Sequence, residues 1–271
     1  MNRALIAKTV RDHGSLFLLV FLAAVGVALL VIVALSSAPI ELMSQWMNLP
    51  WVRNLFRMLL GADIMDMLNR TSFAAFAFVH PMMLSLVWAF LIVICTRVPA
   101  GEVDRGTADL LLSLPVSRWG VYVSVSVVVF GCGALLAVAP WLGAWLSERV
   151  RDWPEPLLLG RLFLAAVNNL VAVWAVAGVG MAVSACCSRR GTAVAVLFAY
   201  LLGSFLLNFL ATLWEPAERL VFLSLLNYYR PLIIIRDAGL DAGDMAVLAA
   251  VAVAGWLIGG VVFARRDIRT T

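Results

Sequence analysis

The sequence of 271 residues is 63% hydrophobic and only 13% charged, whereas an ordinary soluble domain is roughly 45–50% apolar and about 25% charged. Polar side chains are too few to cover a water-soluble protein of this size, so we expect the apolar excess to face lipid. The net charge of +4 comes almost wholly from arginines in short loops between apolar runs. That pattern is typical of the flanks of membrane helices and argues against a nucleic-acid-binding protein.

Six apolar runs are long enough to cross a bilayer, because about 20 helical residues span its hydrocarbon core. They lie near 16–35, 73–95, 120–146, 158–187, 192–214 and 245–263. We therefore predict an all-α, polytopic membrane protein with a single transmembrane domain over residues 1–271. A secretory signal ending near residues 36–38 is the alternative for the first run. That run is longer than the roughly 7–15 apolar residues of a signal, so we expect it to be retained.

Residues 36–72 form a long connection that contains an amphipathic pattern. Its apolar residues recur at helical spacing: Trp51, Val52, Leu55, Phe56 and Leu59. Arg53 and Arg57 take the opposite face, and Pro50 suits the first turn of a helix. The pattern predicts either a helix lying flat in the outer membrane interface or a helix packed on the protein itself.

Few polar side chains interrupt the six runs. The candidates for an intramembrane role are His80, Asn168, Asn169 and Asn208. Ion-driven pumps usually carry several titratable side chains in mid-membrane, whereas a lone histidine is more typical of a contact between helices. We expect His80 to be structural and to donate a hydrogen bond across the bundle near a bend at Pro81. The asparagines are expected to join helices.

The cysteines and two glycines of the last run favour packing over chemistry. Cys95, Cys132, Cys186 and Cys187 lack the spacing of metal ligands. We predict no metal site and interpret all four as small buried apolar residues. Gly255 and Gly259 form a GxxxG pair, which is typical of close helix packing within one chain or between two.

The segment 101–118, between the second and third runs, reads GEVDRGTADLLLSLPVSR. Thr107 can cap a short helix, Asp109 would lie in its first turn, and Pro115 would end it. Its apolar surface would come from Leu110, Leu111, Leu112 and Leu114. Such a helix either packs beneath its own bundle or fits a groove on a soluble partner, and its pattern leaves both readings open.

Two further apolar stretches, 220–226 and 232–235, are too short to span a membrane. They predict re-entrant or surface-lying segments between the fifth and sixth runs.

The distribution of basic residues predicts the orientation. With six spans, both termini fall on one side, whose short flanks carry 11 basic residues. The other side carries nine, spread through longer loops together with 11 of the 16 acids. Because basic residues concentrate in cytoplasmic flanks, we expect both termini to be cytoplasmic.

The chain lacks the residues that an ATPase or a hydrolase requires. Lys8 is its only lysine and follows no glycine-rich turn, so the sequence contains no phosphate-binding loop of the Walker type. The spans also lack paired carboxylates and a nucleophile–histidine pair, so we do not expect an enzyme. The protein either takes energy from a partner or anchors a partner as a scaffold or sensor without transport.

The stretch from Glu102 to Arg118 resembles the signature of the ABC-2-type permeases, the membrane subunits of type V ABC transporters. Its matching parts are an acidic stretch, Arg-Gly-Thr, a leucine run and Pro-x-Ser-Arg. Residues 226–231 (LNYYRP) resemble the segment before the last helix of that family, and 265–268 resemble its C-terminal ending. The first 15 residues look like its amphipathic entry helix. The long 36–72 connection is similar to a subgroup that includes the permease of the nitrous-oxide reductase maturation exporter.

The resemblance implies a permease subunit of an ABC exporter in the bacterial cytoplasmic (inner) membrane. Two permease chains, identical or different, would form the substrate pathway. Separate ATPase subunits would hold ATP and Mg, so this chain would bind no cofactor itself. The resemblance also allows an extracytoplasmic accessory protein. The helix that couples the chain to the ATPase would comprise Glu102, Asp104, Arg105, Thr107, Asp109, Leu110, Leu111, Leu112 and Leu114. The apolar spans by themselves favour a lipid-like or amphipathic cargo.

Overall fold

The computed structural model describes residues 2–38, 45, 48–50, 52–53, 69–106, 116–150 and 152–266. Within these residues, six spans are long and apolar enough to cross a membrane, which confirms the predicted all-helical membrane fold. They are α1 (Arg3–Ser37), α4 and α5 together (Arg70–Val79 and Pro81–Cys95), α8 (Arg118–Val150), α9 (Leu159–Cys186), α10 (Arg190–Ala211) and α13 (Ala242–Arg265).

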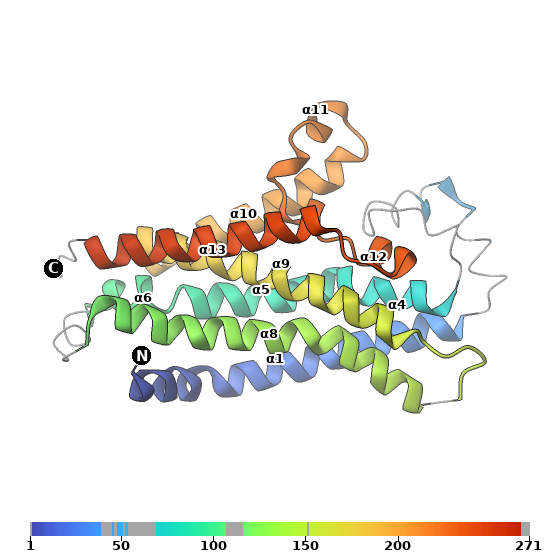
Figure 1. The fold of residues 1–271 in the computed structure, drawn as a ribbon, viewed down its shortest axis with the longest axis horizontal. Coiled ribbons are helices and arrows are strands. Elements are labelled where there is room, and N and C mark those ends of the chain that lie inside the picture. The colour runs from blue at the N-terminus through green and yellow to red at the C-terminus, as the bar shows by residue number, and fades with distance from the viewer. Residues whose placement is uncertain are drawn as a thin grey trace.

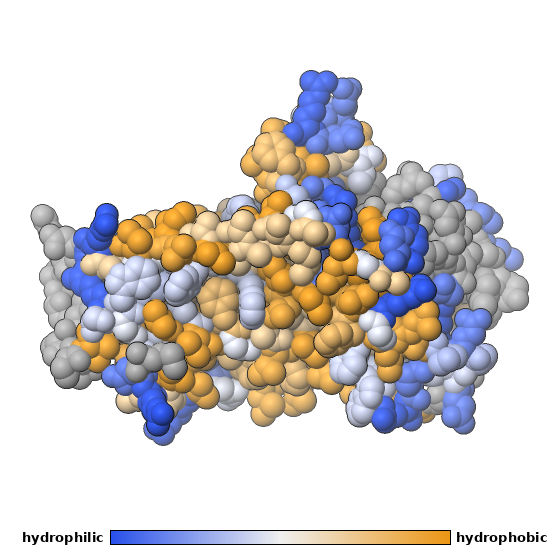
Figure 2. Space-filling view, in the orientation of Figure 1, coloured by the Kyte–Doolittle hydropathy of each residue, from blue (hydrophilic) through white to orange (hydrophobic). Residues whose placement is uncertain are grey.

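The spans lie side by side as an elongated bundle (Figure 1). One end, here called the terminal end, holds both chain termini and the short helix α6 (Ala100–Asp104). The opposite end holds the start of α4 and α12 (Pro231–Asp237). Figure 2 shows an apolar surface along the middle of the bundle and polar side chains toward both ends. This distribution matches a lipid environment around the middle and water at either end.

The 35 residues of α1 extend over about 52 Å, well beyond the roughly 30 Å of a hydrocarbon core. Residues 3–15 are helical, as expected, and they continue directly into the first span. Asn2 caps the helix through a 2.9 Å hydrogen bond from the Ala4 amide to its side-chain oxygen. Its own amide donates to Ser124 Oγ on α8 at 2.9 Å. The N-terminal stretch is therefore packed on the bundle.

The backbones of α9 and α13 touch at small residues. A Cβ atom on Gly178 would lie 2.9 Å from Ala252 Cα, and one on Gly255 would lie 2.6 Å from the Gly178 carbonyl carbon. A Cβ on Gly259 would lie 2.9 Å from the Met181 carbonyl oxygen. Side chains at these positions would push the helices apart, so the predicted GxxxG pair serves packing within this chain.

An ion pair between a buried arginine and a partly exposed glutamate closes the opposite end of the bundle. Arg70 of α4 pairs with Glu148 of α8 and donates to the Glu155 carbonyl at 2.9 Å. Its guanidinium carbon lies 4.2 Å from the centroid of the Trp153 ring. Buried charges are tolerated when they are paired and hydrogen-bonded in this way. The cluster joins α4 and α8 to the connection that leads into α9.

The second span is two helices with His80 between them. Pro81 begins α5, where its missing N–H costs nothing. In place of the expected hydrogen bond across the bundle, His80 Nδ1 accepts a 3.3 Å hydrogen bond from the Met82 amide. The His80 ring packs edge-on against Phe76, with 5.2 Å between centroids. His80 therefore caps its own helix, and the predicted bend at Pro81 is a break between α4 and α5.

The region between α10 and α13 folds into short helices, none of which spans the membrane, as predicted. They are α11 (Glu215–Glu218), η2 (Val221–Leu223), η3 (Leu225–Tyr228) and α12. The hairpin formed by the end of α10 with α11 and η2 projects sideways from the bundle (Figure 1). After the hairpin the chain packs against α10 again, where the Ser224 hydroxyl donates a 2.8 Å hydrogen bond to the Ser204 carbonyl.

One sequence expectation is wrong, and another stays a prediction. The four cysteines are not all buried: Cys95 is buried, but Cys186, the last residue of α9, is exposed. The interfacial helix predicted over residues 50–60 rests on Trp51, Leu55, Phe56 and Leu59, which lie outside the described residues. Its neighbour Val52 is described and is buried.

Candidate functional site

An apolar groove separates α5 from α10. It encloses about 420 Å³, within the range of small-molecule sites. Ten residues line it: Pro81, Leu84, Ser85, Trp88, Ala89 and Ile92 from α5, and Phe198, Leu201, Leu202 and Phe205 from α10. Ser85 contributes the one side-chain hydroxyl of this lining. The groove can therefore hold an apolar body along the membrane-spanning part of the bundle.

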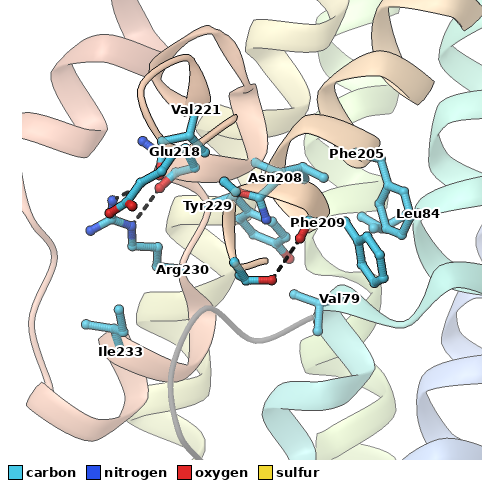
Figure 3. A pocket seen from close by; sticks show the side chains of 14 residues that line it. Val79, Leu84, Phe205, Asn208, Phe209, Glu218, Val221, Tyr229, Arg230 and Ile233 are labelled. Carbon is cyan, nitrogen blue, oxygen red and sulfur yellow. Dashed lines mark hydrogen bonds between the residues drawn. The ribbon is translucent and has the colours of Figure 1, made fainter. Parts of the chain in front are cut away.

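A polar pocket of about 360 Å³ continues the groove toward the opposite end, since Leu84 and Phe205 line both cavities. Figure 3 shows Phe205, Phe209 and Leu84 on one side of the pocket and Glu218 and Arg230 on the other. Its polar lining residues are Asn208, Thr212, Glu218, Asn227, Tyr229 and Arg230. The two cavities together form an amphipathic site. Its part between α5 and α10 is apolar, and its part toward the opposite end of the bundle, here called the mouth, is polar.

Hydrogen bonds between short segments hold the polar pocket open. The Tyr229 hydroxyl donates to the Phe78 carbonyl at 3.0 Å, in the last turn of α4. This bond supplies a partner to a carbonyl that the break at His80 leaves without its usual helical donor. On the α10 side, Ser204 Oγ accepts a 3.0 Å bond from the Leu225 amide. The break in the second span and the returning hairpin therefore build the pocket between them.

Most charges around the pocket are paired. Arg230 Nε donates to the Asn227 carbonyl at 2.6 Å and lies 3.7 Å from Asp244 Oδ2. On α12, hydrogen bonds from Arg236 hold the pKa of the Asp237 carboxyl below its usual value. Arg230 is thus fixed in place at the mouth of the groove.

One short segment at the terminal end connects both walls of the groove. The chain leaves α5 at Cys95 and enters α6 at Ala100. Asp104 Oδ2 then accepts a 3.3 Å hydrogen bond from the Arg190 amide, at the first residue of α10. The Ala100 amide donates to Ser184 Oγ on α9 at 3.3 Å. A displacement of α6 would therefore act on the same end of both helices that line the groove, α5 and α10.

The predicted coupling residues are described only in part. Glu102 and Asp104 lie in α6, and Arg105 pairs with Glu102 at 2.6 Å just after it. The remaining members, Thr107, Asp109, Leu110, Leu111, Leu112 and Leu114, lie outside the described residues.

The three asparagines take different positions. Asn169 joins α9 to α8 by donating to the Ala137 carbonyl at 3.0 Å. Asn168 donates to the Tyr228 carbonyl at 3.3 Å and so joins α9 to the returning segment. Asn208 instead lines the polar pocket. His80, between α4 and α5, lies beside the groove, since its neighbour Pro81 lines it.

Sequence reasoning did not single out Glu218, Tyr229 or Arg230 as site residues. A signal for the last two existed, because both lie in the 226–231 segment that carries part of the family resemblance. Glu218 lies in a short loop helix with no motif, and only the folded hairpin shows that it lines a pocket.

Comparison with known proteins agrees with this architecture. No curated protein matches the chain. A family model described as the C-terminal domain of the multidrug efflux system permease Rv1217c matches residues 18–264, a stretch that includes the groove, its polar mouth and α6. The chain therefore belongs to the family of permease domains defined by the C-terminal domain of the multidrug efflux system permease Rv1217c.

Proposed function

We propose that this chain is the membrane-spanning permease subunit of an ABC exporter of the ABC-2 type, located in the cytoplasmic membrane of a bacterium. Two permease chains, identical or different, form the pathway, and separate ATPase subunits bind ATP and Mg and drive it. The family match supports this proposal, because the protein that gives the family its name is an efflux permease. The missing phosphate-binding loop supports a separate ATPase, since the chain needs an outside source of energy.

The connection of both groove helices to α6 is the observation that carries the proposal. An ATPase bound to the 102–114 segment would pull on α5 through the chain itself. It would act on α10 through the hydrogen bond between Asp104 and the Arg190 amide. Because α9 and α13 are fixed by glycine contacts, the displacement would change the α5–α10 groove and leave the rest of the bundle in place.

The exposed face of α10 supports pairing with a second chain. Large apolar side chains on this helix are 40–55% exposed: Val196, Phe198, Leu202, Leu206 and Leu210. The polar tip of the hairpin projects from the same side of the bundle as α10 (Figures 1 and 2). A second permease chain on this side would enclose the groove and keep the hairpin tip away from lipid.

The orientation follows from the basic flanks, with both termini and α6 in the cytoplasm. A reporter enzyme that is active only outside the cytoplasm, fused after Thr271, should remain silent. An active reporter would reverse the orientation and place α6 where no cytoplasmic ATPase could reach it.

The coupling role is tested by Leu111→Arg in the full complex. This change should abolish co-purification of the ATPase subunits and the ATPase activity that depends on this chain, because a charge would enter an apolar docking surface. Leu240→Arg is the matched control, since Leu240 is exposed near α12 at the opposite end of the bundle. If Leu111→Arg leaves both quantities at the level of the control, the 102–114 segment does not couple an ATPase. Co-purification without any substrate-dependent ATPase activity would favour a scaffold.

A further inference from the structure

The groove and its mouth differ in charge as well as in polarity. Arg230 is the one basic residue that lines the polar pocket, and Glu218 is the one acidic residue. The positive charge of Arg230 is balanced by Asp244 at 3.7 Å, and its guanidinium is also held by Asn227. Glu218 has no side-chain hydrogen bond or ion pair within the part of the chain that the structure describes.

The neighbouring charges do not neutralise Glu218. On the same hairpin, Arg219 pairs with Glu215 at 2.7 Å. On α12, Arg236 pairs with Asp237 at 2.6 Å. With these pairs formed, the polar pocket keeps one uncompensated negative charge, at Glu218. Figure 3 shows Glu218 across the pocket from Phe205 and Phe209, at the mouth of the apolar groove.

We propose that the groove selects amphiphiles that carry a protonated amine. The apolar body lies between α5 and α10, against Trp88, Phe198 and Phe205, and the ammonium group faces Glu218. Asn208 offers an amide oxygen that can accept a hydrogen bond from the same group. The inference rests on the proposed function, in which this groove is part of the export pathway, and it adds the charge of the cargo.

The position of the charge gives this selection a physical basis. Glu218 is exposed at this mouth, so water weakens its attraction for a cation, but a carboxylate within a few ångströms of the headgroup still favours a positive charge over a negative one. An anionic amphiphile of the same chain length would gain the same apolar contacts and meet a repelling charge at the mouth. Discrimination should therefore depend on Glu218 and not on the groove itself.

Trp88 provides a direct measurement, since it lines the apolar groove. The purified chain is placed in phosphatidylcholine nanodiscs without ATPase subunits and titrated at neutral pH with dodecylammonium or dodecyl sulfate, each brominated on the alkyl chain. Bromine atoms quench nearby tryptophans, and the same titration of Trp88→Phe gives the background from the other tryptophans. We expect the cationic probe to quench the Trp88 signal at about one-tenth the concentration that the anionic probe needs.

Glu218→Gln should remove this tenfold preference, whereas Glu215→Gln on the same hairpin should keep it. Glu215 pairs with Arg219 and is not among the residues lining the pocket. Equal quenching by both probes in the unmodified chain, or a preference that survives Glu218→Gln, would overturn the proposal. The titration contains no ATPase, so this outcome would leave the export function standing. If Leu111→Arg shows no coupling defect, the coupling role of the 102–114 segment fails, and the binding preference is unaffected.

Discussion

The contact between α9 and α13 differs from the contact between α5 and α10. In the first pair, glycines bring the two backbones together, and no space remains for a Cβ atom. In the second pair, large side chains hold the helices apart around a groove of about 420 Å³. In the most apolar stretch of α9, 56% of the residues are buried within the chain, whereas the corresponding share in α10 is only 22%.

The difference divides the molecule into a frame (α1, α4, α5, α8, α9 and α13) and a groove wall (α10 and the hairpin up to η2), since one face of α5 is buried in the bundle through Phe90, Leu91 and Ile94. Backbone contacts cannot slide without clashes, because close-packed interfaces have few alternative arrangements. A helix that meets its neighbour through a cavity can move with little loss of contact. The frame should therefore carry most of the stability, and the groove wall should carry most of the function. Matched substitutions in the two regions test this division.

The largest difference in stability is expected between two arginine substitutions, one in the frame and one on the hairpin. Removing one partner of a fully buried ion pair costs about 3–5 kcal/mol. The carboxylate that Arg70→Gln leaves behind, Glu148, is 21% exposed, so the loss of unfolding free energy should be somewhat smaller but still large. Arg219→Gln on the hairpin breaks a pair whose side chains are 77% and 74% exposed, and exposed pairs contribute about 0–1 kcal/mol. Unfolding of both variants in mixed micelles at increasing SDS content measures the two losses. Losses of similar size would contradict the division.

Glycine gives the next comparison. Gly178→Ala places a methyl group against the backbone of α13 and should cost about 1–3 kcal/mol or more. Gly203→Ala in α10 meets no heavy atom within 4 Å, and it should leave stability unchanged or raise it slightly. Thermal unfolding in detergent, monitored by tryptophan fluorescence, measures both. A stable Gly178→Ala variant would mean that α9 and α13 can separate as readily as the groove helices.

Asparagine gives the smallest expected effect on folding. Asn169→Leu removes a hydrogen bond between α9 and α8 and should cost about 0.6–1.7 kcal/mol. Asn208→Leu lines the polar pocket and should hardly change the unfolding midpoint. It should instead weaken the quenching of Trp88 by brominated dodecylammonium, whose headgroup can donate a hydrogen bond to the Asn208 amide oxygen. The division would fail if Asn208→Leu destabilised the chain while probe binding stayed unchanged.

The number of spans was predictable from the sequence, because length and hydropathy alone decide whether a helix crosses a bilayer. Pro81 predicted a disturbance in the second span, but its consequence depended on contacts far away in the chain. The sequence beside His80 contains no sign that Tyr229 donates to the Phe78 carbonyl across 151 positions. The GxxxG pair predicted close packing but did not identify its partner, Gly178, which belongs to a different span.

The groove was harder to predict for the same reason. Leu84, Trp88 and Phe205 belong to runs that are apolar throughout, so hydropathy does not distinguish a residue that faces a cavity from one that faces lipid. Glu218 reads as an ordinary loop acid until the hairpin brings it to the pocket. The groove exists because the apolar faces of α5 and α10 are not in full contact, and no local sequence pattern predicts such a gap.

The contact between Ser204 and Ser224 has a consequence for how the chain enters the membrane. Residues 215–241 are too short in any apolar stretch to be integrated as a span. Their place in the structure depends on contacts with α10 such as the buried serine pair. The insertion machinery can therefore position α10 and α13 from hydropathy, while the segment between them settles only afterwards, against a helix already in the bilayer. Biogenesis would then have two stages, integration of the spans followed by docking of the hairpin, and the amphipathic site would appear only in the second.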